Sequence, residues 1–231
     1  MQLSISEQEL KSYLKNQLSL FFPDRYGMEG KDVDQAFRLS LERLENCFSY
    51  LTFPAYCNDS GQTFFSHLHA DQYAQFLYYF SNSLWKISQN RPVCDKLMYL
   101  NRLLHNVFFS YKGNLPDIFF LGHPSGTILG NAVYDNYLVV FQNVTVNTGA
   151  EQSGNPAPVL GKGLFLGAGA KIIGNRKIGD RVSIGVDAVV YDQEIADDQV
   201  VIRNKYGEIQ ISDRKKSCCM AQNYFRVTIE S

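Results

Sequence analysis

The residue best suited to chemistry is His123, in the segment LGHPSGTILG at 121–130. It is the last of four histidines, and glycines and other small residues surround it. An imidazole has an ordinary pKa of about 6.5, so it can take a proton from a hydroxyl near neutral pH. We therefore predict that His123 is a general base. A purely structural histidine is the alternative interpretation.

The earlier histidines fit a metal site less well. His67 and His69 form an H-x-H motif, which can bind metal, but no third ligand is apparent beside them. We predict no metal site, and we expect a polar loop that leads into a helix. Asp71 then supplies a negative charge at the helix N-terminus. In a second interpretation, Asp71 reaches the chemistry at His123 through the tertiary fold.

Composition and charge exclude several classes of protein. The 231 residues are 45% hydrophobic and 19% charged, as in a globular chain, and the formal net charge is −1. This balance argues against nucleic acid or an anionic membrane as a partner. We find neither a run of 18 apolar residues nor the apolar core of a signal peptide. Because the five cysteines are odd in number, we predict a cytoplasmic protein with reduced thiols.

The first 112 residues predict a helical domain, because apolar residues recur three and four apart in several stretches. These stretches are 6–22, 32–51, 69–87 and 94–111. Ser6 is the expected N-cap of the first helix. Aromatic residues are dense in the last two stretches, and we expect them to form a helical core rather than a cofactor site.

From about residue 118 the apolar pattern changes to a period of six. Thirteen of the 17 glycines lie between residues 111 and 190. A six-residue period matches neither a helix nor a flat strand, but it matches a β-helix with three hexapeptides to a coil. We expect the apolar residue of each hexapeptide to point inward and to stack on its counterpart one coil away, over four to five coils. These residues are Ile128, Tyr134, Val140 and Val146, followed by Leu160, Leu166, Ile172, Ile178, Ile184 and Val190.

The period breaks over residues 147–158, where NTGAEQSGNPAP is polar and rich in turn formers. We expect a loop that leaves the coil at this point. Loops on a regular scaffold often carry function, so this loop is a candidate part of the site.

Two segments carry a resemblance to a known family. LGHPSGTILGNAVYDNYLVVFQNVTVN at 121–147 and GKGLFLGAGAKIIGNRKIGDRVSIGVDAVV at 161–190 resemble the serine acetyltransferases of the left-handed β-helix acyltransferase superfamily. The resemblance implies acetyl-CoA-dependent O-acetyltransfer with His123 as general base, in a homotrimer with active sites between subunits. The implied α+β fold has an α-helical domain at 1–112, a left-handed parallel β-helix of hexapeptide repeats at 113–205, and a C-terminal tail at 206–231.

The resemblance also places the co-substrate acetyl-CoA. The stretch Gly167-Ala168-Gly169-Ala170 matches the family's CoA groove, where small side chains let the pantetheine arm approach backbone N–H groups. We expect Gly185 in the same groove. Arg203 and Lys205 follow the last strand, and we expect them to meet the CoA phosphates. An exposed basic tail is the alternative.

Two departures from the family concern the acceptor. The family has an aspartate before the histidine, which helps to hold the amino group of serine, and Gly122 stands there in this chain. The family also has an Arg-His pair in the loop, where this chain has Pro156 and Ala157. Removing one member of a buried charge pair typically costs about 2–5 kcal/mol. We therefore favour a sugar or glycan hydroxyl over serine as acceptor, with polysaccharide biosynthesis as the setting.

The alternatives are serine itself, the amine of an amino sugar, and a non-catalytic β-helix binding protein. A γ-class carbonic anhydrase of the same fold is excluded, because it needs three histidines to hold zinc and the β-helix has only His123. We expect Gly122, Asn143 and Asp135 to line the acceptor.

The sequence leaves open which group orients the imidazole of His123. The family uses an aspartate from the preceding coil, and that coil is truncated here. Asp117 and Asp135 are the nearest acids in the sequence, and Asp71 lies in the helical half. A backbone carbonyl can do the same work.

Overall fold

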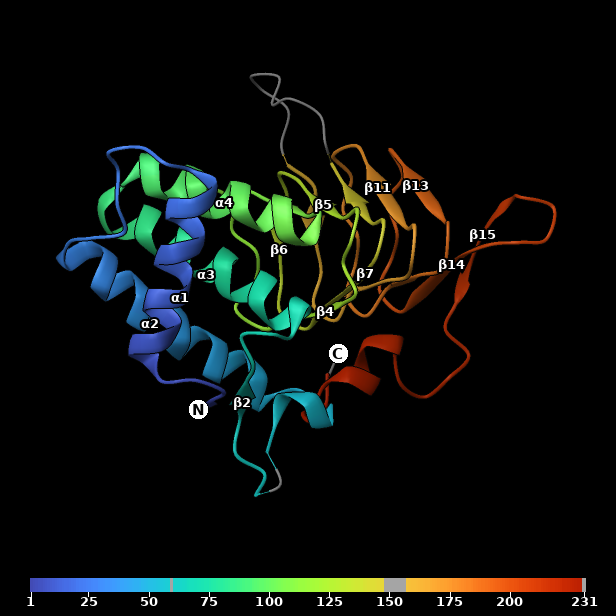
Figure 1. The fold of residues 1–231 in the computed structure, drawn as a ribbon. Helices are drawn as coiled ribbons and strands as arrows, with labels where there is room; N and C mark the ends of the chain where they lie inside the picture. Colours follow the sequence, from blue (N-terminus) through green and yellow to red (C-terminus); the bar gives the residue numbers. More distant parts are fainter. Residues whose placement is uncertain (59, 148–156, 230–231) are drawn as a thin grey trace. The chain divides into compact units, whose positions relative to one another are not determined.

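The computed structural model describes residues 1–58, 60–147 and 157–229, and the chain divides into two compact units (Figure 1). The first unit comprises Met1–Ser49 and Phe53–Lys112. The second comprises Tyr50–Thr52 and Gly113–Ser231. The predicted fold class, a helical domain followed by a left-handed parallel β-helix, is confirmed. Among the described residues, no helix is long and apolar enough to cross a membrane.

The helical unit is built around one buried helix. Helix α3 packs against α2 and α4, and its rings of Phe76, Tyr79 and Phe80 are fully buried. The predicted aromatic core is therefore confirmed. The helices are α1 (Glu7–Phe21), α2 (Lys31–Ser49), α3 (Ala70–Ser88) and α4 (Arg91–His105), with a 3-10 turn at Pro54–Tyr56 and short strands β1 (Gln2–Leu3), β2 (Phe64–Phe65) and β3 (Phe108–Phe109).

Ser6 begins the first helix as predicted. Its hydroxyl accepts a hydrogen bond from the Glu9 N–H at 3.2 Å, and the Ser6 N–H donates to the Glu9 carboxylate at 2.8 Å. This reciprocal capping box satisfies two backbone donors that the helix itself leaves unpaired.

The second unit is a three-sided stack of coils. Face 1 contains β4 (Phe119–Gly122), β7 (Leu138–Phe141), β10 (Phe165–Leu166), β12 (Ser183–Ile184) and β14 (Gln199–Arg203). Face 2 contains β5 (Ile128–Leu129), β8 (Thr145–Val146), β11 (Lys171–Ile173) and β13 (Val189–Tyr191). Face 3 contains β6 (Val133–Tyr134) and β9 (Val159–Leu160), and bridges extend it to Ile178 and Ile195. Neighbouring strands within these faces are parallel.

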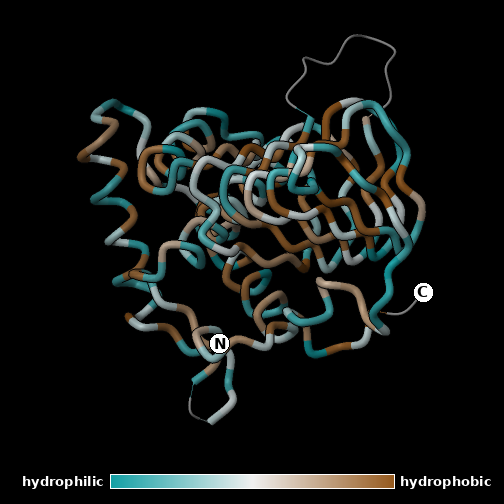
Figure 2. Tube along the Cα trace, turned by 90° about the vertical axis from the view of Figure 1, so that its right-hand side faces the viewer, coloured by the Kyte–Doolittle hydropathy of each residue, from teal (hydrophilic) through white to brown (hydrophobic). Residues whose placement is uncertain are grey.

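Burial confirms the period of six over most of the coils. From Leu160 to Val190, the six predicted inward residues are no more than 2% exposed. Hydrophobic positions recur on successive coils in the tube of Figure 2. Each inward side chain is covered by its counterparts above and below, which removes its apolar surface from water.

The prediction was wrong for Ile128, which is 36% exposed. Leu129 points inward instead, is 2% exposed, and pairs in register with Val146. The turn between Leu121 and Leu129 is two residues longer than the corresponding turn between Val140 and Val146. This insertion shifts the register of the first coil, and it lies in the segment that contains His123.

The last residues of the chain return to the β-helix. Strand β15 (Ile209–Asp213) pairs antiparallel with β14, so the hairpin continues across residue 205. A 3-10 helix follows at Met220–Tyr224, and Phe225 forms an antiparallel bridge with Leu51. We refer to residues 214–229 as the C-terminal segment.

Candidate active site

His123 lies at the edge of the β-helix where face 1 turns toward face 2. Strand β4 ends at Gly122, which is in register with Phe141 of the next coil. Extending the pairing of β7, β10 and β12 by one residue places Gly167 and then Gly185 above them. The residues that follow these positions are His123, Gln142, Ala168 and Val186, which we call the His123 edge. Coils stack about 4.8 Å apart, so His123 and Ala168 are roughly 10 Å apart along this edge.

The backbone around His123 is held in an unusual conformation. His123 has a φ of +50° and is exposed. Its carbonyl accepts a hydrogen bond from the Ser125 N–H at 2.8 Å. The Thr127 hydroxyl donates to the Phe141 carbonyl at 2.9 Å and accepts from the Val144 N–H, which ties the turn to the next coil. An exposed imidazole on a fixed turn is well placed to meet a substrate.

Asn143 lies on the same turn region one coil beyond His123. Its N–H donates to the Ser125 carbonyl at 2.9 Å, its φ is +57°, and its side chain is exposed. This position is compatible with the predicted contact between Asn143 and the acceptor.

Two of the predicted acids lie away from His123. Asp117 and His123 lie beyond opposite ends of β4, whose four residues alone span roughly 13 Å. Asp135 follows β6 at the end of face 3, and its N–H donates to the Leu160 carbonyl. Both acids are therefore on a different edge of the β-helix from His123. Within one chain, neither Asp117 nor Asp135 fits the predicted hydrogen bond to the imidazole.

Asp71 belongs to the helical unit. It lies in the first turn of α3, as expected for a charge at a helix N-terminus, and it is 7% exposed. The neighbouring His69 is the N-cap residue, and within the described ranges its buried Nδ1 has no hydrogen-bond partner. His67 Nδ1 lies 2.8 Å from the Ser4 hydroxyl. In the described part of the chain, no three residues with metal-ligand side chains come together.

The predicted CoA stretch needs a correction in its hydrogen bonding. The N–H groups of Gly167, Gly169 and Ala170 already donate to carbonyls of the coil, at 2.8, 2.9 and 3.0 Å. Among the described residues, the Ala168 N–H donates to no group. Ala168 is also partly exposed, whereas its three companions are buried. Only one of the four predicted donors is therefore available to a pantetheine arm.

Gly167 and Gly185 serve the close stacking of the coils at this edge. A methyl group built on Gly167 would lie 3.2 Å from backbone atoms of the coil above. The corresponding distance from Gly185 to the Val201 carbonyl oxygen is also 3.2 Å. Larger side chains at these positions would push the coils apart or displace the backbone.

Gln142 was missed by the sequence analysis. It lies on the His123 edge between His123 and Ala168, and its buried Oε1 has no hydrogen-bond partner among the residues that the structure describes. A buried amide oxygen usually accepts a hydrogen bond, so an unpaired one beside a candidate site is notable. Only the register of the coils could reveal its position, because a glutamine in a polar turn is unremarkable in a sequence.

Arg203 and Lys205 lie at the far end of the same stack. Arg203 ends β14 and pairs with Ile209 in the hairpin, and Lys205 lies in the hairpin turn with its Nζ 5.0 Å from the Tyr206 ring centre. Both side chains are exposed. Their contact with CoA phosphates stays a prediction.

Known proteins with similar sequences are serine acetyltransferases. The serine acetyltransferase of Synechococcus elongatus is 35% identical over 119 residues, which are 51% of this chain and 49% of that protein. The Escherichia coli K12 enzyme is 37% identical over 71 residues, or 30% of this chain and 26% of that protein. No family model matches the chain.

Known structures agree at the level of the fold. The Neisseria gonorrhoeae serine acetyltransferase superposes with a TM-score of 0.65 at 20% identity, covering 92% of this chain and 83% of that one. The chain is serine acetyltransferase-like in sequence and in fold. The serine acetyltransferase-like chain spans about half the length of the Synechococcus relative and about a quarter of the Escherichia coli one.

The loop that the sequence predicts at 147–158 in this serine acetyltransferase-like chain is only partly described. Pro156, one of the two departures from the family's Arg-His pair, lies outside the described residues. Ala157 is described, and it precedes β9. An alanine has no charged or hydrogen-bonding side chain to offer a carboxylate.

Proposed function

We propose that the protein is an acetyl-CoA-dependent O-acetyltransferase. The observation that carries the proposal is the position of His123, exposed on the edge that also holds Ala168, in a chain similar to serine acetyltransferases. The roughly 10 Å between the two residues leaves room for the end of a pantetheine arm that runs along the edge.

In the proposed reaction, the imidazole of His123 takes the proton of the acceptor hydroxyl as its oxygen attacks the thioester carbonyl. The tetrahedral intermediate then collapses, the C–S bond breaks, and CoA leaves as a thiolate that takes the proton back from the imidazolium. General-base catalysis of this kind typically contributes about 10²–10⁴-fold. The Ala168 N–H is the donor that we assign to the pantetheine arm.

Serine is the acceptor that the comparisons support. Similar proteins are named serine acetyltransferases, and one similar structure is a Neisseria gonorrhoeae serine acetyltransferase in complex with serine. Another is a serine acetyltransferase in complex with CoA. The preference for a sugar and the setting in polysaccharide biosynthesis find no support in these proteins.

An uncharged hydroxyl compound is a second candidate acceptor, because of Gly122 and Ala157. Neither residue provides the charge that the family uses to hold a zwitterionic amino acid. A homotrimer with sites between subunits is a further part of the proposal and rests on the resemblance. A cytoplasmic location is another part and rests on the odd number of cysteines. Light scattering of the purified protein tests the trimer.

An acceptor screen tests the proposal directly. We expect CoA to be released when acetyl-CoA is mixed with serine or with one of a panel of uncharged hydroxyl compounds. A thiol reagent detects the released CoA. A reaction without acceptor corrects for hydrolysis of the thioester. Acetyl-CoA that binds but releases no CoA with any acceptor would instead indicate a non-catalytic binding protein.

A further inference from the structure

A cluster of aromatic rings covers the outer side of face 1 next to the His123 edge. Phe120, Phe141 and Phe165 project from successive strands, and Tyr224 of the C-terminal segment packs against all three. Its ring centre lies 5.0, 6.0 and 5.9 Å from theirs. Phe141 and Phe165 are also in contact, at 5.7 Å. The ring of Tyr224 therefore covers three rings that come from three consecutive coils.

This cluster explains why glycine stands before His123. A methyl group built on Gly122 would lie 2.8 Å from Phe141 Cε1, closer than real Cβ atoms approach a carbon, and 3.2 Å from Phe120 Cε1. The Phe141 ring has little freedom to move aside toward Tyr224, because the Tyr224 ring packs against it at 6.0 Å. Any side chain at position 122 would have to displace this ring.

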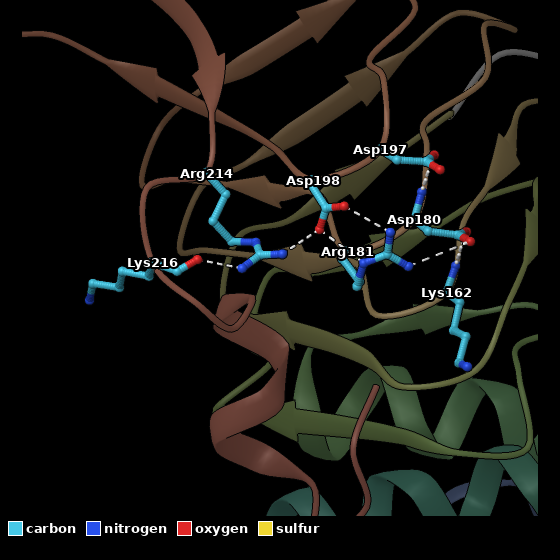
Figure 3. A network of polar contacts seen from close by, with 7 residues as sticks. All are labelled: Lys162, Asp180, Arg181, Asp197, Asp198, Arg214 and Lys216. Carbon is cyan, nitrogen blue, oxygen red and sulfur yellow. Dashed lines mark hydrogen bonds and ion pairs between the residues drawn. The ribbon is translucent and has the colours of Figure 1, made fainter. Parts of the chain in front are cut away.

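The C-terminal segment is held on both sides of Tyr224, by the β-helix before it and by residues Tyr50–Thr52 after it. Before it, the Arg214 guanidinium donates to Asp198 at 2.6 Å, and Asp198 also accepts two hydrogen bonds from Arg181, at 2.9 and 2.8 Å (Figure 3). After it, the Arg226 guanidinium donates to the Leu51 carbonyl at 2.7 Å.

The main chain on either side of the 3-10 helix is also paired. The Thr52 N–H donates to the Tyr224 carbonyl at 3.2 Å, and the Arg226 N–H donates to the Tyr50 carbonyl at 2.8 Å. A ring held between two such attachments has a defined position, which a free tail would not give it.

We propose that Phe141, held in place by Tyr224, is a specificity-determining residue on the acceptor side of His123. It fills the space next to the general base in which the family carries a carboxylate for the ammonium group of serine. This contact favours the second candidate acceptor of the proposed function, a hydroxyl compound whose neighbouring group is uncharged. The aromatic ring supplies apolar contact and a surface for stacking in place of a charge. This inference rests on the proposed O-acetyltransferase activity.

The test compares two acceptors in four variants. Serine and the best uncharged acceptor of the screen are assayed with Phe141→Ala, Gly122→Asp, the double variant of both, and Phe165→Ala. The Phe165→Ala variant is the matched control, because it removes a ring from the same cluster one coil farther from Gly122. Circular dichroism confirms that each variant is folded, and the double variant provides space for the acid if Gly122→Asp alone fails to fold.

We expect the natural protein to show a higher kcat/KM for the uncharged acceptor than for serine. The double variant should change the ratio of the two kcat/KM values at least tenfold in favour of serine. We expect this change to come from KM for the acceptor, while KM for acetyl-CoA stays the same. Phe165→Ala should leave the ratio within twofold.

Three results would overturn the inference. The inference is wrong if the natural protein prefers serine. It is also wrong if the double variant turns over both acceptors with an unchanged ratio. In both cases the proposed acetyltransferase activity stands. Lack of turnover with every acceptor overturns the proposed function and the inference together.

Discussion

At the scale of single residues, the backbone of His123 decides how its role is best tested. Its φ of +50° lies in the left-handed region, which asparagine tolerates far better than alanine does. Alanine at this position would combine the loss of the imidazole with backbone strain, so any loss of activity would have two causes. Asparagine removes the general base and preserves the turn.

We predict that His123→Asn lowers turnover at least about a hundredfold, because a carboxamide cannot take the hydroxyl proton. Acetyl-CoA binding and the melting temperature should stay close to those of the natural protein. His123→Ala should show the same loss of turnover together with a lower stability, by roughly 1 kcal/mol. Steady-state kinetics with thiol detection and thermal melts separate the two effects. Full activity in His123→Asn would show that another group is the base.

Residue types alone revealed His123, but not its neighbours in space. From the sequence, Gly122 was interpreted as the loss of a charged partner for serine. The structure shows a steric reason for glycine at this position, because a side chain there would clash with the ring of Phe141. Gln142 gave no signal in the sequence, although it lies next to His123 on the edge. Asp117 and Asp135 are near His123 in sequence and on another edge in space. Closeness along a β-helix is set by register, and neighbours in register are 17 to 26 residues apart in this chain.

At the scale of elements, the ion cluster around Asp198 joins the C-terminal segment to the coils. Asp198 lies between the guanidinium groups of Arg181 and Arg214 (Figure 3). The side chain of Arg181 is 7% exposed, so its charge is largely shielded from water. Hydrogen bonds from Arg181, against the opposing effect of burial, lower the pKa of Asp198 to about 2. The ionised carboxylate is therefore what the fold stabilises.

We predict that Asp198→Asn lowers the free energy of unfolding of the β-helix unit by about 2–3 kcal/mol, because the buried Arg181 guanidinium loses its two hydrogen bonds to the carboxylate and keeps the longer 4.0 Å ion pair to Asp180. Breaking a fully buried ion pair typically costs about 3–5 kcal/mol. We expect a smaller loss here because the side chain of Asp198 is 36% exposed. Urea unfolding followed by tyrosine fluorescence measures the change. Asp198 has a φ of +60°, which asparagine accepts, so strain does not contribute.

Asp192→Asn is the matched control for this substitution. Asp192 accepts a hydrogen bond from Arg176 at 3.1 Å, but the two side chains are 49% and 56% exposed, so the loss should stay below about 1 kcal/mol. The contribution of Asp198 is present above the unfolded pKa of about 3.9 and is lost as the pH falls toward 2. The natural protein should therefore lose stability over this range more steeply than Asp198→Asn. Equal slopes would refute the role of the Asp198 carboxylate.

At the scale of the whole molecule, each of the two units contains an ionisable group whose pKa is shifted. His105 ends α4 in the helical unit, and its Nδ1 lies 2.8 Å from Asn101 Oδ1. Burial lowers the pKa of His105 to about 4. The folded helical unit thus holds a neutral imidazole at a pH where the unfolded chain takes up a proton.

We predict that the helical unit loses stability as the pH falls from about 6.5 to 4, by up to about 3 kcal/mol from His105 alone. Above pH 6.5 the imidazole is neutral in both states and contributes no pH dependence. Thermal unfolding followed by circular dichroism at 222 nm reports the helices. His105→Gln keeps a polar side chain beside Asn101 but does not titrate, so its stability should fall less over this range. The same slope in both proteins would contradict the assignment.

The sequence by itself determined the helical domain, the coils and the candidate base. A period of 3.6 or six is a local property, because each repeat must bury an apolar side chain, and the spacing of those side chains can be read from the chain. Only the tertiary structure decided that Leu129 replaces Ile128 in the core, that Gln142 lies beside His123, and that Tyr224 packs on Phe141. Phe141 and Tyr224 are 83 residues apart, and their contact depends on the attachments at Asp198 and Leu51 rather than on any repeat. Periodicity records which residues are buried, and contacts between distant segments depend on how whole faces fit together.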